Sequence, residues 1–112
     1  MKTVRQFGVY RNTSPRTGRT HPYLVVVQSD RWPMNDRLVV PLIPRAFFAL
    51  DDIPRIVLTP TFEIEGRQVF VNPFELTPVP ISRLGEEVAS LAHDEDARRR
   101  IQKALDEAMS PY

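Results

Sequence analysis

The chain contains no cysteine, and glycine is scarce, with four in 112 residues. The absence of cysteine excludes disulfide bonds and thiol nucleophiles. The two histidines, His21 and His93, do not stand with acidic residues at the spacing of a metal site, and the glycines form no phosphate-binding motif. A serine between two glycines, which marks one class of hydrolase, is also missing. The sequence therefore predicts neither a metal ion nor another cofactor.

Net charge and long apolar runs are lacking as well. A formal net charge of +1 gives no argument, through the field of the whole molecule, for nucleic acid or membrane as a partner. No apolar run is long enough to span a bilayer, and the first residues lack the apolar core of a signal peptide. We therefore expect one soluble domain over residues 1–112, located in the cytoplasm, with no membrane partner and no specific contact with nucleic acid.

The first two thirds of the chain indicate short strands. Eleven prolines, most of them between Pro15 and Pro80, disfavour long helices there. Residues 23–27 and 38–43 are valine-rich runs typical of buried strands, and both faces of their sheet should be covered, one of them by a helix or a second subunit. Pro41 cannot donate a ladder hydrogen bond, so it should lie at a bulge or an edge. Further strands are predicted at residues 5–11 and 55–59, and in a hairpin at residues 62–71 that turns at Glu65–Arg67.

Beyond Pro80 the apolar spacing becomes helical. A first short helix is predicted from Ser82, because apolar residues recur there at helical spacing: Ile81, Leu84, Val88 and Leu91. Gly85 is unusual inside a helix and indicates either the close approach of another backbone or a later helix start. A second helix should begin at Asp94, with acidic residues in its first turn, and run to about Met109. The predicted class is mainly β with C-terminal helices (α+β): strands over about residues 3–79 form a barrel-like antiparallel sheet, and helices occupy about residues 82–109.

Two groups of residues could carry chemistry. Residues 12–22 include Arg16 and Arg19 but no acid, so this loop could hold a phosphate backbone or an acidic partner, or could be a solvated hairpin tip. A ribonuclease without a metal needs a base, an acid and a cation. These could be supplied by the following residues together with several arginines: His21 or His93, Glu63 and Asp94.

Several short motifs spread over the chain resemble one known family. They are Gln6-Phe-x-Val-Tyr10, Val27-Gln-Ser-Asp30, Val40-Pro-Leu42, Leu58-x-Pro60 and, above all, Val79-Pro-Ile-Ser-x-x-Gly-Glu-Glu-Val-Ala-x-Leu-x-His93. In these motifs the sequence is similar to the CcdB family of toxins from bacterial toxin-antitoxin modules. The resemblance implies a homodimer of small SH3-like barrels of antiparallel strands with a C-terminal helix, a fold shared with the MazF and Kid ribonuclease toxins. It also implies a protein that is not an enzyme: it binds the A subunit of DNA gyrase and traps it on cleaved DNA until a disordered antitoxin segment removes it.

The resemblance also implies a set of gyrase-binding positions. They are Ser29, Arg31, Trp32, Lys103, Glu107, Ala108 and Met109. Family members that poison gyrase end in Trp-Gly-Ile where this chain has the last three of these residues, so Trp32 or Tyr112 would have to supply the missing aromatic anchor. Arg16 and Arg19 are the expected antitoxin contacts. Two alternatives stay open: a metal-free ribonuclease toxin on the same fold, and a relative without gyrase activity that still binds an antitoxin.

Overall fold

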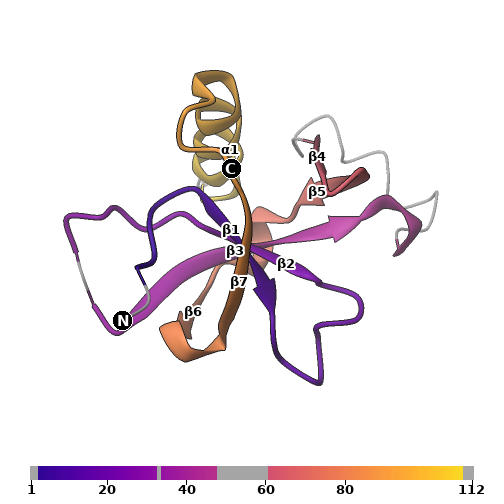
Figure 1. The fold of residues 1–112 in the computed structure, drawn as a ribbon. Helices are drawn as coiled ribbons and strands as arrows, with labels where there is room; N and C mark the ends of the chain where they lie inside the picture. The colour runs from indigo at the N-terminus through magenta and orange to yellow at the C-terminus, as the bar shows by residue number, and fades with distance from the viewer. Residues whose placement is uncertain (1–2, 33, 48–60, 110–112) are drawn as a thin grey trace.

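The computed structural model describes residues 3–32, 34–47 and 61–109. Seven antiparallel strands form one sheet in the order β4-β5-β3-β2-β1-β7, with β6 paired to β3 (Figure 1). The strands are β1 (Gly8–Asn12), β2 (Tyr23–Val26), β3 (Asp36–Pro44), β4 (Thr61–Ile64), β5 (Arg67–Val71), β6 (Thr77–Pro80) and β7 (Leu84–Ser90). Among the described residues, three short 3₁₀ turns, η1 (Arg45–Phe47), η3 (Pro73–Glu75) and η4 (Ile81–Arg83), precede the C-terminal helix α1 (Glu95–Ala108). The predicted class, mainly antiparallel β with a C-terminal helix, is confirmed.

The long strand β3 changes partner along its length. On one side it pairs with β2 throughout its middle, with Leu24 opposite Pro41. On its other side β6 runs beside Asp36 to Val39, and β5 beside Leu42 to Pro44. Pro41 lies between these two partners, and its carbonyl accepts a hydrogen bond of 3.2 Å from the Asn72 amide. The proline therefore occupies neither a bulge nor an outer edge but the break between two neighbouring strands, where a missing N–H is harmless.

Both faces of the sheet are covered, as the valine runs predict. One face carries a core that includes Val25, Val40 and Leu42 together with Ile101 and Leu105 of α1. The opposite face carries a smaller core of Val4, Tyr10, Leu24, Val26, Val39 and Leu84. The helix thus covers one face, and the second core lies on the other side of the same strands. Among the described residues, no helix is long and apolar enough to cross a membrane.

Helix α1 begins and ends close to the predicted residues. The Asp94 side chain caps it by accepting a hydrogen bond of 2.9 Å from the Ala97 amide. Its buried stripe is Ala97, Ile101, Ala104 and Leu105. The Arg100 guanidinium lies 4.9 Å from the centre of the Phe62 ring, which joins the exposed edge of the helix to β4.

The helix predicted from Ser82 to Leu91 is wrong. Residues 81–83 form the turn η4, and the next seven residues form β7, which pairs with β1 through two register shifts. Because β7 pairs with β1, β1 has a strand on each side. The hydrogen bonds and packing of this pairing outweigh the helical spacing of the apolar residues. The prediction for Gly85 is right in this different setting, because a Cβ there would lie 3.1 Å from the Arg11 carbonyl oxygen. The strand expected at residues 55–59 lies outside the described residues.

Candidate functional site

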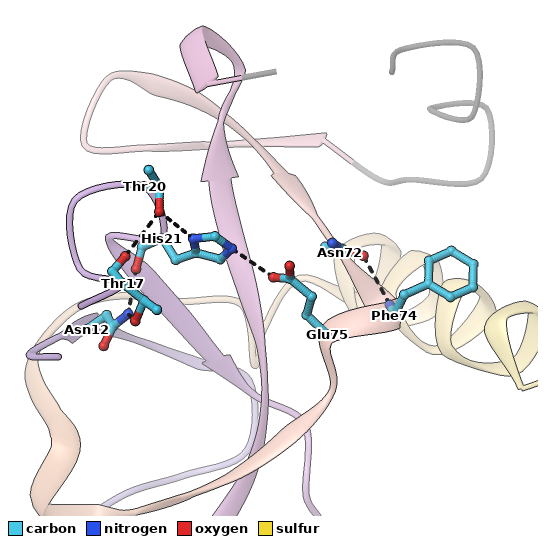
Figure 2. Close-up of polar contacts among 7 residues, drawn as sticks. All are labelled: Asn12, Thr17, Thr20, His21, Asn72, Phe74 and Glu75. Atoms are coloured by element: carbon cyan, nitrogen blue, oxygen red, sulfur yellow. Dashed lines mark hydrogen bonds and ion pairs between the residues drawn. The ribbon is translucent and has the colours of Figure 1, made fainter. Parts of the chain in front are cut away.

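The loop between β1 and β2 is organised by the Asn12 side chain. Its amide nitrogen donates hydrogen bonds of 2.9 Å to Thr17 Oγ1 and to the His21 carbonyl oxygen, and its Oδ1 accepts one of 3.0 Å from the Ser14 amide. Within the loop, the His21 amide donates to the Thr17 carbonyl oxygen at 2.8 Å. These bonds fix the backbone on which the His21 imidazole is presented (Figure 2).

The turn η3 presents a carboxylate to this imidazole. Asn72 Oδ1 accepts from the Phe74 amide at 3.1 Å, and the Asn72 carbonyl oxygen accepts from the Glu75 amide at 3.2 Å. Pro73, at the start of the turn, is buried and has a fixed φ. Because the turn is held at both its side-chain cap and its backbone, Glu75 leaves it in a defined direction.

His21 and Glu75 form a hydrogen-bonded pair whose members are 54 residues apart in the sequence. His21 Nε2 lies 2.8 Å from Glu75 Oε2, and His21 Nδ1 lies 2.8 Å from Thr20 Oγ1 (Figure 2). Both ring nitrogens therefore have partners, which sets the orientation of the ring. The side chains are 25% and 46% exposed, so both groups can meet a ligand.

The pair borders a pocket of about 570 Å³. Its apolar lining comes from Leu24, Pro41, Leu76, Val79 and Pro80. Since Leu24 belongs to the second core, the pocket lies on the sheet face opposite the one covered by α1. Arg83 also lines it, and no hydrogen bond or ion pair with another described residue engages the guanidinium of Arg83. The pocket thus combines an apolar interior with a base, an acid and a cation.

A second polar cluster is already fully engaged. Glu65 Oε1 accepts a hydrogen bond of 2.7 Å from the Tyr23 hydroxyl, and Glu65 Oε2 forms an ion pair of 2.7 Å with Arg11 Nη2. The hydrogen bonds from Tyr23 and Arg11 lower the pKa of Glu65. Burial, together with the hydrogen bond to Glu65, raises the pKa of Tyr23. With both carboxylate oxygens occupied and its basicity reduced, Glu65 is suited to holding the sheet together and poorly suited to proton transfer.

The gyrase-binding positions implied by the resemblance fall in two places. Ser29, Arg31 and Trp32 form the turn between β2 and β3, in which the Trp32 amide donates to the Ser29 carbonyl oxygen at 3.2 Å. Lys103, Glu107, Ala108 and Met109 lie in the second half and at the end of α1. Within the described part of the chain, no hydrogen bond or ion pair joins the two groups. Tyr112 lies outside the described residues.

The other candidates separate in the structure. Arg16 and Arg19 are exposed in the loop that also supplies Ser14 and Thr17 to the wall of the pocket. Asp94 is committed to capping α1, and the exposed Glu63 side chain lies on β4. Of the two histidines, His21 is the one found beside a carboxylate, and that carboxylate, Glu75, was missed by the sequence analysis. The available signal was the Asn72-Pro73 pair, which marks the start of a fixed turn.

No three His, Cys, Asp or Glu side chains of the described residues gather where they could hold a metal ion. The side chains that border the pocket can support acid–base chemistry, with His21 and Glu75 as the proton-carrying groups and Arg83 as a cation for the ligand.

The overall fold is shared with solved ribonucleases. An endoribonuclease from a mycobacterial species, solved in complex with its cognate antitoxin, superimposes with a TM-score of 0.68 at 14% identity, over 96% of this chain and 95% of that one. A second mycobacterial endoribonuclease superimposes with a TM-score of 0.66 at 15% identity, over 100% of this chain and 97% of that one. The fold is thus one that toxins of toxin-antitoxin modules use. No curated protein sequence matches the chain.

The family model described as CcdB protein matches residues 6–110, and the chain belongs to the CcdB family. The resemblance seen in the sequence motifs is thereby confirmed. One expectation drawn from it is contradicted. We expected a protein that is not an enzyme, whereas the two solved structures compared above are named as endoribonucleases.

Proposed function

We propose that the protein is the toxin of a toxin-antitoxin module and that it cleaves RNA without a metal ion. The observation that carries the proposal is the contact of 2.8 Å between His21 and Glu75 at the edge of a pocket that Arg83 also lines, with a guanidinium that no described residue engages. Membership of the CcdB family and the endoribonuclease names of the two structural neighbours support it.

The proposed reaction starts from a Glu75 carboxylate without a proton and a His21 imidazole with one, two groups that the contact of 2.8 Å places side by side. When RNA enters and separates the two groups, Glu75 takes the proton from a ribose 2′-hydroxyl while the resulting oxygen attacks the adjacent phosphorus. His21 gives its proton to the departing 5′-oxygen, and Arg83 balances the charge that builds up on the phosphoryl oxygens. The products are a 2′,3′-cyclic phosphate and a free 5′-hydroxyl.

Cleavage of a defined RNA in the presence of a chelator tests this mechanism. His21→Ala and Glu75→Gln should each lower the cleavage rate by about 10² to 10⁴-fold, the usual range for loss of a general acid or base. His93→Ala, which removes an exposed histidine outside the pocket, is the matched control and should cleave normally. Product ends other than a cyclic phosphate and a 5′-hydroxyl, or full activity in both pocket variants, would contradict the assignment.

A cognate antitoxin is the expected partner. One structural neighbour was solved with its own antitoxin. The exposed Arg16 and Arg19, in a loop with no acidic residue between positions 12 and 22, suit an acidic and partly disordered segment. Such a toxin would act in the cytoplasm.

A homodimer is the expected assembly. Three large apolar side chains are mostly exposed: Met109 at the end of α1 by 72%, Trp32 by 67% and Met34 by 63%. A second subunit that covered them would remove this apolar surface from water. Sedimentation of the purified chain at micromolar concentration should therefore show a dimer, and Met109→Asp should weaken it. A monomer at all concentrations would contradict this assembly.

Binding to the A subunit of DNA gyrase is the second candidate function. Membership of the CcdB family favours it, and Trp32 and Met109 offer exposed apolar side chains at two of the implied gyrase-binding positions. The test is a gyrase cleavage assay with the wild-type chain and with Trp32→Ala and Met109→Ala. Trapped cleavage complexes that both substitutions reduce would support this function, and their absence with the wild-type chain would exclude it.

A further inference from the structure

The pocket has the size of a site for a planar ring, with apolar residues for the face of the ring and polar residues for its edge. A volume of about 570 Å³ falls within the range of small-ligand sites and exceeds what one base needs. Leu24 and Pro41, opposite each other on β2 and β3, line it together with Leu76 and Val79. Arg83 brings a positive charge to the same pocket, so a planar base joined to a phosphate is complementary to it in size and charge.

Phe74 offers a second apolar surface beyond Glu75, on the side away from His21 (Figure 2). Its side chain is 76% exposed, although it belongs to a turn held by the Asn72 cap and the buried Pro73. Figure 2 shows that Glu75 and Phe74 leave this turn in opposite directions, the carboxylate toward His21 and the ring away from it. The backbone of Phe74 is thus fixed and its ring is open to solvent, so a face of the ring is available for stacking on a base.

We propose that the pocket receives one unstacked base of a single-stranded RNA and that Phe74, which lies beyond Glu75 on the side away from His21, stacks on a second base. The inference rests on the proposed ribonuclease function and adds its substrate class: a single strand with two splayed bases flanking the reacting phosphate. The bases of a duplex are stacked on each other and cannot reach both places. Arg83 lies at the pocket, and Arg16 and Arg19 lie in the loop beside it, where phosphates of the same strand would pass.

The experiment measures the binding of short RNA oligonucleotides to the protein. The 2′-hydroxyl at the cleavage position is replaced by hydrogen, so that the RNA is not cut. In a series of such oligonucleotides, each position in turn lacks its base. Thr77→Phe fills the pocket from an exposed position on its wall, and Thr77→Val is its control of nearly unchanged size. Phe74→Ala removes the stacking ring, and Phe74→Tyr retains it. Phe47→Ala, at an exposed phenylalanine in η1, controls for the loss of an aromatic elsewhere. Thermal melting of every variant confirms that it is folded.

Thr77→Phe and Phe74→Ala should each weaken binding of the intact oligonucleotide by about ten-fold, the scale of one base contact, while the three controls bind normally. Each loss should vanish at one abasic position, and the two positions should differ and flank the cleaved bond. Equal affinity for all abasic oligonucleotides, or unchanged binding in both variants, would overturn the inference. A wild-type chain that binds in the expected pattern but leaves the cleavable RNA intact would instead contradict the ribonuclease function and leave the base-binding site standing.

Discussion

The Tyr23 hydroxyl donates a hydrogen bond of 2.7 Å to Glu65, which joins the start of β2 to the tip of the hairpin formed by β4 and β5. The same carboxylate pairs with Arg11 on β1, so one side chain connects three places in the sheet. Glu65 and Gly66 make the tip with positive φ values of 51° and 74°. The hairpin turn that the sequence predicts therefore also places the carboxylate where β1 and β2 can reach it.

Stability should depend on the ionisation of Glu65. Its pKa in the folded protein is lowered from 4.5 by Tyr23 and Arg11, so its stabilising contribution is fully present above that ordinary value and is lost as the pH falls through the lowered one. Glu65→Gln should therefore lower the Tm at neutral pH and have little effect once the wild-type carboxylate is protonated. Tyr23→Phe should raise the pKa of Glu65, measurable by a carboxyl NMR titration. A Tm difference that does not change with pH would contradict this account.

The loop that carries His21 should depend on Asn12. Asn12→Ala removes two donated hydrogen bonds and one accepted bond, with an expected loss of about 1 to 2 kcal/mol in the free energy of unfolding. RNA cleavage should fall with it, and the amide of His21 should exchange faster with solvent because the loop opens locally. Asn35→Ala, at an exposed asparagine before β3, is the matched control. Unchanged exchange at His21 would show that the loop holds its shape without Asn12.

Antitoxin binding should weaken when the exposed arginines of the loop are removed. Arg16→Ala with Arg19→Ala should slow association and make it less sensitive to salt, because charges at the edge of an interface act mainly on the encounter of the partners. Arg5→Ala with Arg45→Ala removes the same charge from other exposed positions and should change the rate much less. Equal effects of the two double variants would mean that net charge, and not the loop, steers the partner.

Helix α1 should be held by its buried stripe more than by its cap. Ile101 is fully buried, and Ile101→Ala should lower the free energy of unfolding by about 3 kcal/mol, whereas Asp94→Ala removes one capping bond and should cost about 1 kcal/mol. Lys103→Ala, on the exposed side of the helix, serves as the control. Urea unfolding measures all three. Similar losses for Ile101→Ala and Lys103→Ala would contradict the assignment of the buried face.

The parts of the fold that the sequence predicts well are those fixed by local signals. Valine runs identify β2 and the middle of β3, the Glu65–Arg67 turn identifies the hairpin, and Asp94 marks the start of α1 within one residue. The strand β7 was not predicted because the apolar residues of Leu84–Ser90 follow helical spacing. This segment forms a strand because it pairs with the free edge that β1 would otherwise have, a contact that the local sequence does not reveal.

The candidate site was half visible in the sequence for a similar reason. His21 was a candidate base from its chemistry alone, while its partner Glu75 lies 54 residues away in a segment without a recognisable strand or helix pattern. The two meet because β3 pairs with β2 on one side and with β5 on the other, so the loop that leads into β2 and the turn that follows β5 come together across β3. No local spacing could have brought them together.

Pro41 affects the heat-capacity change that is expected when a ligand binds in the pocket. The strand break beside it exposes a proline ring and Leu24 to the pocket without leaving an unpaired N–H. Water on such a surface is held weakly, so a ligand that covers it releases that water without breaking good hydrogen bonds. Binding at this apolar surface should give a negative heat-capacity change that is nearly independent of salt. Contacts between Arg83 and a phosphate should instead give a salt-dependent affinity with a small heat-capacity change.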